Sequence, residues 1–351
     1  MRIPAACLAA AIAITAGCGP RPAGVDDFSV LREYGWDMPL AEPQATFNPQ
    51  NNQVAARAPD GFAVLDEGSG KQGFFRGQSG REGFWPEWIH GYQFVIGGSA
   101  NAEKLADGRV VPPTEGLTVI SVRDDGTVRE RQLARVGFKP KYWAARKRIV
   151  AQIENKLWMF DPEGEGEDYG EGFYAVPQRK GDGLAYQETP VFDADHWTAK
   201  PVLGRLFIQW GDRNRVSEIP GAVEPSWTAT GGVVATALRA DPPKDQPWHQ
   251  APTELVHLGG QGHRVETIAA DLHGPAAHPT QPIVAATTKD GRLVLVSLLD
   301  KRVRELAPVG ARARWNHDGT RLMAQEPVLD KPDASYLRVY VFKIVTGDKK
   351  K

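Results

Sequence analysis

The sequence predicts an all-β protein folded as a single β-propeller, for which seven four-stranded blades fit best. Three observations predict this fold. Short runs of β-favouring residues, bounded by Gly, Pro, Asp and Asn, recur in pairs along the chain. The pairs repeat at a mean spacing of roughly 45 residues, which is typical of a four-stranded propeller blade. The 37 Gly and 27 Pro residues favour many turns, and amphipathic helices are hard to find.

Each pair is expected to be a strand, a turn and a second strand. The pairs are 53–57 with 62–65, 92–96 with 117–122, 148–153 with 157–160, 185–192 with 205–210, 232–238 with 253–258, 283–288 with 293–298, and 321–325 with 337–344. A single blade cannot bury both of its faces, so closure into a ring covers each blade with its neighbours and leaves only short edges. A six- or eight-bladed ring and a pair of β-sandwiches remain open alternatives.

A local motif supports the repeat. Trp315-Asn-His-Asp-Gly319 precedes the strand that begins at Arg321. It resembles the aromatic-Ser-Pro-Asp-Gly signature of TolB-type propellers, which are similar to tryptophan-aspartate repeat propellers, with His317 in place of Pro. The resemblance implies that Asp318 and Gly319 form a tight turn and that Trp315 packs between blades. Weaker copies are expected at 47–56, 278–296 and 138–161, and the propeller domain is expected to span residues 28–347.

The amino terminus has the pattern of a secretory signal peptide over residues 1–17. Arg2 supplies a positive charge, and the apolar run from Ala5 to Ala16 is too short to span a bilayer. The following Thr15-Ala-Gly-Cys18 resembles the bacterial lipobox, although Thr15 stands where an aliphatic residue is usual. The resemblance implies cleavage before Cys18 and acylation of its sulfur and new amino group. The alternative is an ordinary signal peptide cut elsewhere.

Residues 18–27 are predicted to be a tether that follows the lipidated Cys18 and joins the ring to a membrane. Gly19, rather than Asp, follows that cysteine. In a Gram-negative host this favours the outer membrane over the inner membrane. We therefore expect a location in the bacterial cell envelope.

The composition excludes several classes of function. The chain has two cysteines, and Cys7 lies in the segment expected to be removed. The mature chain would then have no free thiol and no intramolecular disulfide, which excludes cysteine nucleophiles and thiolate metal sites. The net charge is −1 with both signs interspersed, so nucleic acid is not an expected partner.

The densest acidic stretch runs from Asp161 to Asp168, with Glu171 beyond it. Its alternating carboxylates before a Gly could wrap Ca²⁺. An EF-hand loop, however, needs Glu at its twelfth position, where this chain has Gly172. We interpret the stretch as a solvated loop.

Five of the eight histidines lie close together in the sequence: His249, His257, His263, His273 and His278. Such a group could hold zinc or copper. No pair has the spacing that places two rings on one face, so loop and strand-end positions are the favoured interpretation.

Aromatic residues gather between Gly73 and Tyr92: Phe74, Phe75, Phe84, Trp85, Trp88 and Tyr92. They could form a partner or glycan surface, but inter-blade core is favoured for most of them. The piece Trp85-Pro-Glu-Trp88 is expected in a loop, because Pro86 should interrupt a strand.

No catalytic motif of a known class is present, and we predict no catalytic, cofactor-binding or metal-binding residue; Cys18 is the one predicted site, for lipid attachment. The favoured function is a non-enzymatic platform that binds another envelope protein. The plan resembles the propeller lipoprotein of the outer-membrane assembly machinery. The alternatives are a glycan-active hydrolase or lyase with its site at the mouth of the central channel, and a sensor that binds a metal or small ligand.

Overall fold

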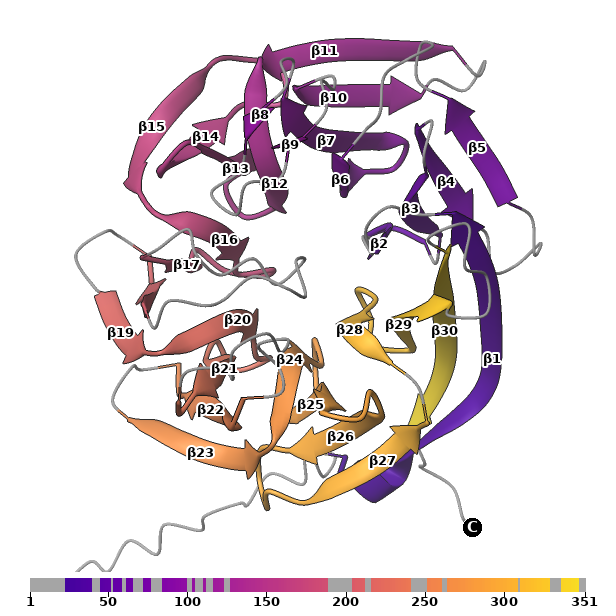
Figure 1. The fold of residues 1–351 in the computed structure, drawn as a ribbon, viewed down its shortest axis with the longest axis vertical. Helices are drawn as coiled ribbons and strands as arrows, with labels where there is room; N and C mark the ends of the chain where they lie inside the picture. The colour runs from indigo at the N-terminus through magenta and orange to yellow at the C-terminus, as the bar shows by residue number, and fades with distance from the viewer. Residues whose placement is uncertain are drawn as a thin grey trace, which may run out of the picture.

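The fold was analysed in a computed structural model. It describes residues 23–39, 45–51, 53–58, 61–65, 72–76, 84–99, 103–104, 110–111, 116–122, 127–188, 204–211, 216–240, 251–260, 264–308, 310–328 and 336–346. These residues form antiparallel sheets that surround a central axis like the blades of a propeller (Figure 1). The described part holds one short 3₁₀ helix, η1 (Val25–Asp27), and otherwise strands. The predicted all-β propeller is confirmed.

Most sheets have four strands, which are named in order from the axis outward. The first is β2 (Ala45–Phe47), β3 (Val54–Ala58), β4 (Gly61–Leu65) and β5 (Gln72–Arg76). Another is β16 (Phe173–Pro177), β17 (Leu184–Gln187), β18 (Arg205–Gln209) and β19 (Val216–Pro220). The next two are β20 (Ala222–Trp227), β21 (Val233–Leu238), β22 (Thr253–Leu258) and β23 (Val265–Ala270), then β24 (Leu272–Ala277), β25 (Ile283–Thr288), β26 (Leu293–Ser297) and β27 (Val303–Ala307). The closing sheet is β28 (Ala311–Trp315), β29 (Arg321–Val328), β30 (Tyr336–Thr346) and β1 (Phe28–Pro39).

The remaining strands form an eight-stranded sheet and a small hairpin. The large sheet contains β6 (Phe84–His90), β7 (Gln93–Ser99), β10 (Leu117–Val122), β11 (Val128–Ala134), β12 (Val136–Trp143), β13 (Arg148–Ile153), β14 (Lys156–Phe160) and β15 (Gly166–Glu171). The hairpin is β8 (Glu103–Lys104) with β9 (Val110–Val111). Pairing of β7 with β12 joins two four-stranded units into the large sheet. Divided there, the described strands form seven four-stranded units, but the fused sheet leaves the number of separate blades a prediction.

The strand pairs expected from the sequence are the second and third strands of these units. Four predicted strands have the observed bounds: β10, β13, β22 and β25. Both central strands are covered by neighbouring sheets, so they carry continuous apolar runs. The six side chains of β21, for example, are all buried. The outer strand β23 is mostly exposed or half-buried, which explains why periodicity did not reveal it.

The ring is closed by the two ends of the chain. β1 pairs antiparallel with β30 along its length, from Phe28 opposite Thr346 to Pro39 opposite Tyr336. The side chain of Phe28 is fully buried in the core formed by the β24–β27 sheet and the closing sheet. Closure therefore joins the amino-terminal and carboxy-terminal strands by hydrogen bonds and by apolar packing.

Part of the segment predicted to be a tether is docked onto the ring. Val25 is 1% exposed and belongs to the same core cluster as Phe28. Arg304 donates hydrogen bonds to the carbonyl oxygens of both residues, at 3.0 Å and 2.6 Å. Asp26 pairs with Arg302 at 2.6 Å. Residues 23–27 are thus held against β26 and β27.

Two sequence expectations about inner strands are wrong. The Trp85–Trp88 piece lies in β6 and not in a loop, because the strand shifts register between Phe84 and Glu87 and accommodates Pro86 there. The motif copy expected to start at Phe138 lies inside β12. Trp143, at the end of that strand, occupies the position that Trp315 occupies in β28.

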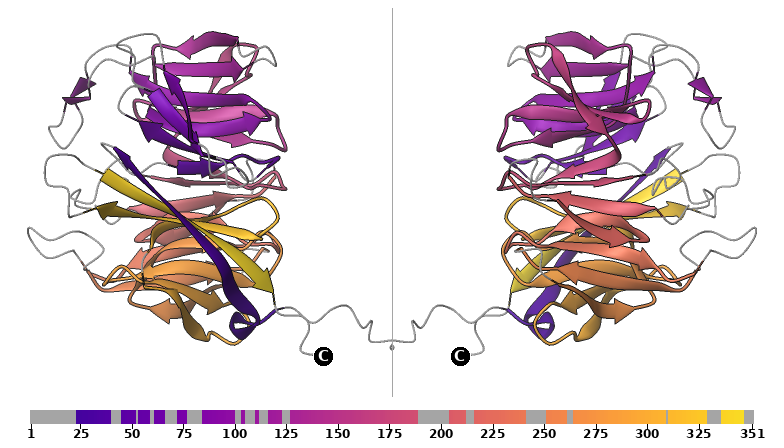
Figure 2. Two further views of the ribbon diagram at one scale, coloured as in Figure 1. Left: turned by 90° about the vertical axis from the view of Figure 1, so that its right-hand side faces the viewer. Right: turned by 90° about the vertical axis from the view of Figure 1, so that its left-hand side faces the viewer.

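The ring has two distinct ends. The terminal end carries the turns from first to second and from third to fourth strands, together with η1, Phe28 and Thr346. The loop end carries the connections from second to third strands, including the β8–β9 hairpin. Figure 2 shows β8 and β9 beyond one end of the ring and η1 at the other.

Candidate functional site around the axis of the ring

The inner strands share a bulge near the loop end. Registers shift between Phe138 and Lys141 and at the equivalent place in β16, β20, β24 and β28. One residue in each bulge has a positive φ: Lys139, Tyr174, Glu224, Gly274 and Arg312. All five are half-buried, and those of their chain neighbours whose side chains are described are buried. A left-handed residue opening a bulge is ordinarily Gly, so four larger side chains are kept there at some cost in backbone strain.

The bulges contact one another around the axis. Lys139 Nζ lies 4.0 Å from the centre of the Tyr174 ring, which joins β12 to β16 by a cation–π contact. Glu224 accepts hydrogen bonds from the backbone N–H of Gly274 at 2.7 Å and from Thr236 Oγ1 at 3.0 Å. Charged groups thus link neighbouring sheets at the loop end.

Arg179 joins opposite sides of the ring at the terminal end. It lies in the hairpin between β16 and β17, and its Nη1 donates to the carbonyl oxygen of Asn316 at 3.0 Å, beyond β28. Part of the Arg179 side chain is exposed, but the protein around it removes some of its hydration and so lowers its pKa, while the charges of Glu87 and Asp318 act in the opposite direction. Among the described residues Arg179 has no ion pair within hydrogen-bonding range, so its cation is held mainly by a backbone carbonyl.

An ion pair joins two adjacent inner strands, β6 and β12. Lys141 Nζ of β12 bonds Glu87 Oε2 of β6 at 2.9 Å, and their side chains are 25% and 19% exposed. The carboxylate of Glu87 is thereby occupied by a close cation. Charged side chains of β6, β12, the β16–β17 hairpin and β20 thus make contacts between strands and between sheets.

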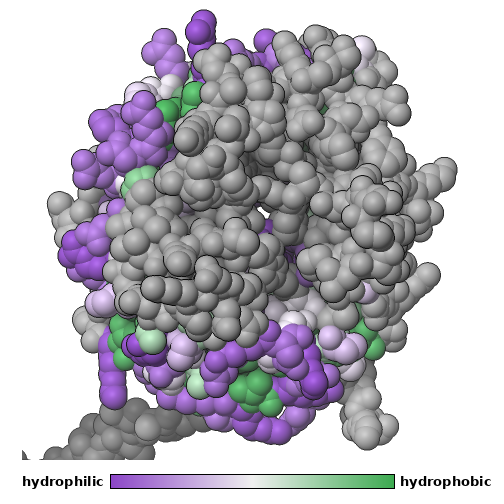
Figure 3. Space-filling model, in the orientation of Figure 1, coloured by the Kyte–Doolittle hydropathy of each residue, from purple (hydrophilic) through white to green (hydrophobic). Residues whose placement is uncertain are grey.

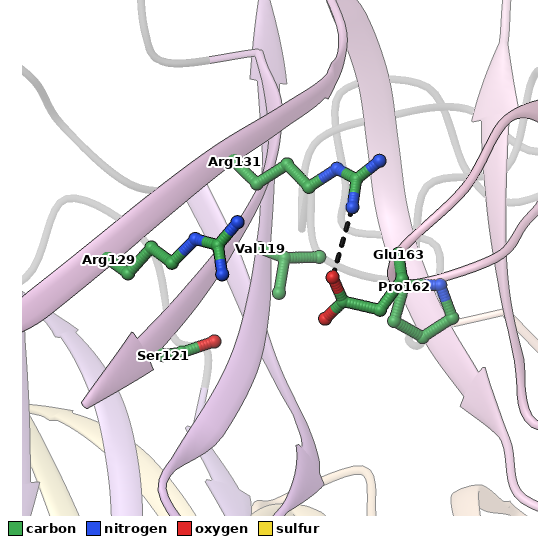
Figure 4. Close-up of a pocket in the computed structure, with 6 residues that line it drawn as sticks. All are labelled: Val119, Ser121, Arg129, Arg131, Pro162 and Glu163. Atoms are coloured by element: carbon green, nitrogen blue, oxygen red, sulfur yellow. Dashed lines mark hydrogen bonds and ion pairs between the residues drawn. The ribbon is translucent and has the colours of Figure 1, made fainter. Parts of the chain in front are cut away.

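A shallow pocket lies on the outer side of the large sheet (Figure 4). It is lined by Val119, Ser121, Arg129, Arg131, Pro162 and Glu163. Arg131 Nη1 pairs with Glu163 Oε2 at 3.0 Å. The backbone N–H of Glu163 also donates to Asp161 Oδ1 at 2.8 Å. The carboxylates of Asp161 and Glu163 thus serve a turn and an ion pair. The interpretation of the whole acidic stretch as a loop is wrong for its second half, because the residues from Gly166 to Glu171 pair with β14 as strand β15.

The described histidines occupy separate positions. His257 lies in β22 with Nδ1 3.7 Å from Glu266, and burial lowers its pKa. His273 is buried in β24. His278 follows β24 in the first turn of its sheet. His249 and His263 lie outside the described residues, within which no group of three or more His, Cys, Asp or Glu is placed to hold a metal.

The aromatic segment divides between core and surface. Trp88 is 5% exposed, packs edge-on against Phe94, and donates its Nε1–H to the carbonyl of Thr46 at 3.3 Å. This agrees with the inter-blade core favoured from the sequence. Tyr92 is 58% exposed. The side chains of Phe74, Phe75, Phe84 and Trp85 lie outside the described part.

The sequence contains a signal for the inner strands that periodicity did not reveal. A proline follows the left-handed residue in three of them: Lys139-Pro140, Glu224-Pro225 and Gly274-Pro275. Trp85-Pro86 has the same place in β6. Inner strands lie at a sheet edge, except that Val136 and Gly137 of β12 pair with β7, and a missing N–H is tolerated along such an edge. Proline here marks a strand bulge and not a loop.

Cys18 lies outside the described residues. In the part of the chain that the structure covers, no helix has the length and apolar character needed to cross a bilayer.

Comparison with solved structures supports the fold. The chain is similar to the β-propeller domain of Cps50 (Swd1) from Myceliophteria thermophila, with a TM-score of 0.57, 14% identity, and coverage of 88% of this chain and 99% of that one. It is also similar to a chain of the mitotic checkpoint complex, with a TM-score of 0.58, 13% identity and coverage of 98% of both chains. A catalytically inactive virginiamycin B lyase from Staphylococcus aureus with quinupristin has a TM-score of 0.54, 9% identity, and coverage of 89% and 100%.

No family model matches the chain, and no curated protein matches its sequence. The similar structures include an enzyme, a β-propeller domain and a chain of a multiprotein complex. At these identities the likeness shows the fold alone, since propellers serve many unrelated functions.

Proposed function

We propose that this chain is a lipid-anchored protein of the bacterial cell envelope whose ring presents its loop end to a partner protein. The observation that carries the proposal is that the docked amino-terminal segment and the long connections lie at opposite ends of the ring. The segment leading back to Cys18 docks at the terminal end, whereas the long connections leave from the loop end (Figure 2). A protein held at one end offers the other to its surroundings.

The loop end has the features of a recognition surface. The connections 188–204 and 239–252 are longer than about 12 residues, a length that in compact domains is often functional. The charged bulge residues Lys139 and Glu224 lie at the same end of the ring. Along the part of the rim that the structure describes, hydrophilic residues predominate, with hydrophobic residues scattered among them (Figure 3).

Anchoring rests on the Thr15-Ala-Gly-Cys18 sequence, and Gly19 favours the outer membrane. The resemblance of the Trp315 motif to TolB-type repeats also stays a prediction. Anchoring is tested by fractionating the native host. Wild-type protein should sediment with membranes and yield an acylated amino-terminal peptide by mass spectrometry, whereas Cys18→Ser should give neither an acylated peptide nor processing at residue 18.

The platform role is tested by affinity capture from detergent-solubilised envelopes. Wild type should recover a stoichiometric partner. Replacing residues 190–202 with a short Gly/Ser linker should abolish recovery without changing the melting temperature, whereas Tyr92→Ala, at the terminal end, should retain it. Absence of any stoichiometric partner, or equal recovery by both variants, would contradict the proposal.

A further inference from the structure

The large hydrophobic side chains that the described surface exposes all lie at the terminal end. They are Tyr92, Val128, Val265, Leu299 and Val303, which are 58%, 49%, 39%, 65% and 50% exposed. Tyr92 lies in a turn from first to second strand, and Leu299 in a turn from third to fourth. The other three begin outer strands at that same end. Within the described residues no comparable side chain is exposed at the loop end.

The chain leading to the lipidation position is short. Ala23 is fixed to the ring, because its N–H donates to Gln281 Oε1 at 3.2 Å and its side chain packs on the core. Four residues lie between it and Cys18 in the sequence, so the two Cα atoms are five steps apart. At full extension they span about 17 Å. A lipid on Cys18 would therefore keep the terminal end close to the bilayer, whatever the path of the connecting residues.

We propose that the terminal end of the ring rests on the phospholipid surface through these exposed apolar side chains. The inference rests on the proposed lipid anchor, which keeps the ring near the membrane. The apolar residues then determine which end of the ring faces the membrane. Single apolar side chains around a face insert weakly by themselves, so the covalent lipid makes their contact intramolecular and effective.

Two arginines that could meet phospholipid headgroups lie at this end. Arg129 follows Val128 on β11 and has no ion pair among the described residues, while Arg131 lies beside it at the pocket of Figure 4. Basic residues next to an anchor are attracted to anionic lipid. The bulge residues and long connections then face away from the membrane.

The test uses the scarcity of cysteine. Once the signal peptide is removed, the wild-type chain holds only Cys18. Single cysteines are introduced at Val265 and Ala270, which are exposed at opposite ends of the same outer strand, β23. Along a strand these positions are separated by about 17 Å. Washed membrane fragments are treated with a polymer-linked maleimide, and each labelling rate is divided by that of the same variant in detergent.

We expect V265C to be labelled several-fold more slowly on membranes than in detergent, and A270C to show no such difference. Equal ratios for the two variants would overturn the orientation. Protection of V265C that persists in detergent would also overturn it, because a partner protein or a second copy would then cover the face.

The wild-type parent separates this inference from the proposed anchor. An acylated Cys18 does not react, so the parent should remain unlabelled in the membrane fraction. A parent that is labelled and found in the soluble fraction would refute the anchor, and the orientation with it. An unlabelled, membrane-bound parent with equal V265C and A270C ratios would refute the orientation alone.

Discussion

At the residue scale, a buried or half-buried polar side chain follows the first strand of several sheets and organises the turn to the second. The residues are Asn48, Gln178, Thr228, His278 and Asn316, and in each the backbone N–H bonds a carbonyl across the turn. Their side chains accept backbone N–H groups of the same turn. These bonds satisfy buried donors that the turn would otherwise leave unpaired.

His278 is the titratable member of this set. Its Nδ1 accepts the N–H of Gln281 at 3.0 Å, and its Nε2 lies 3.2 Å from the carbonyl of Gly319 in the next sheet. Its ring packs edge-on against Trp315 with centroids 4.6 Å apart. A Cβ at position 319, where φ is +79°, would overlap this imidazole, so a glycine is required there. Burial lowers the pKa of His278 from 6.5 to about 4.

The stability of the protein should therefore fall as the pH drops from 6.5 to about 4. In this window the unfolded state takes up a proton on His278 that the folded state does not, which costs at most about 3 kcal/mol. H278N keeps an acceptor for the turn and cannot titrate. Urea unfolding at pH 7.5 and pH 4.5 should show a smaller loss for the variant than for wild type. Equal losses would show that His278 has the same pKa in the folded and the unfolded state.

At the scale of elements, the central strands could be predicted and the edge strands could not. β21 and β25 are buried on both faces and so read as continuous apolar runs. β11 and β23 are outer strands with mixed exposure. The proline of β6 suggested a loop, because a bulge that accommodates it depends on pairing with β7, which no local pattern reveals.

The closing strand β1 should contribute strongly to stability. Phe28 is fully buried and meets the rings of His278 and Trp315 edge-on at 5.5 Å and 6.3 Å. F28A leaves a cavity and should cost about 3–5 kcal/mol in the free energy of unfolding. Y92A, which removes an exposed aromatic ring, should change that free energy by less than about 0.5 kcal/mol. Chemical denaturation checks both, and similar effects of the two variants would contradict this role of β1.

At the scale of the whole molecule, contacts across the ring combine the sheets into one unit. Trp143 donates its Nε1–H to the carbonyl of Gly181 at 3.1 Å, and Arg146 pairs with Asp182, so two consecutive sheets are joined at their turns. Arg179 reaches a carbonyl 137 residues away on the opposite side. A ring held in this way should unfold as a unit.

Closure by hydrogen bonds between terminal strands predicts that the ring tolerates circular permutation. Phe28 and Thr346 are register partners, so a short linker can join them. New termini within residues 190–202 would leave β17 and β18 to close the ring by the pairing they already make. The permutant should retain a single cooperative thermal transition by circular dichroism. A permutant with its new termini within the buried strand β25 should lose this transition. If both permutants kept it, or both lost it, this view of closure would be contradicted.

By itself, the sequence determined the class of fold. Central strands buried between sheets must be apolar, and a repeating unit must return at a regular spacing, so both leave a local record that can be read without coordinates. The same holds for the Thr15-Ala-Gly-Cys18 motif, because the expected lipid attachment at Cys18 depends only on residues that are neighbours in the sequence. The tertiary structure alone decided that η1 docks on β27, that Arg179 crosses the axis, and that exposed apolar side chains share the terminal end. These features join residues that are far apart in the chain, and only closure of the ring places them together.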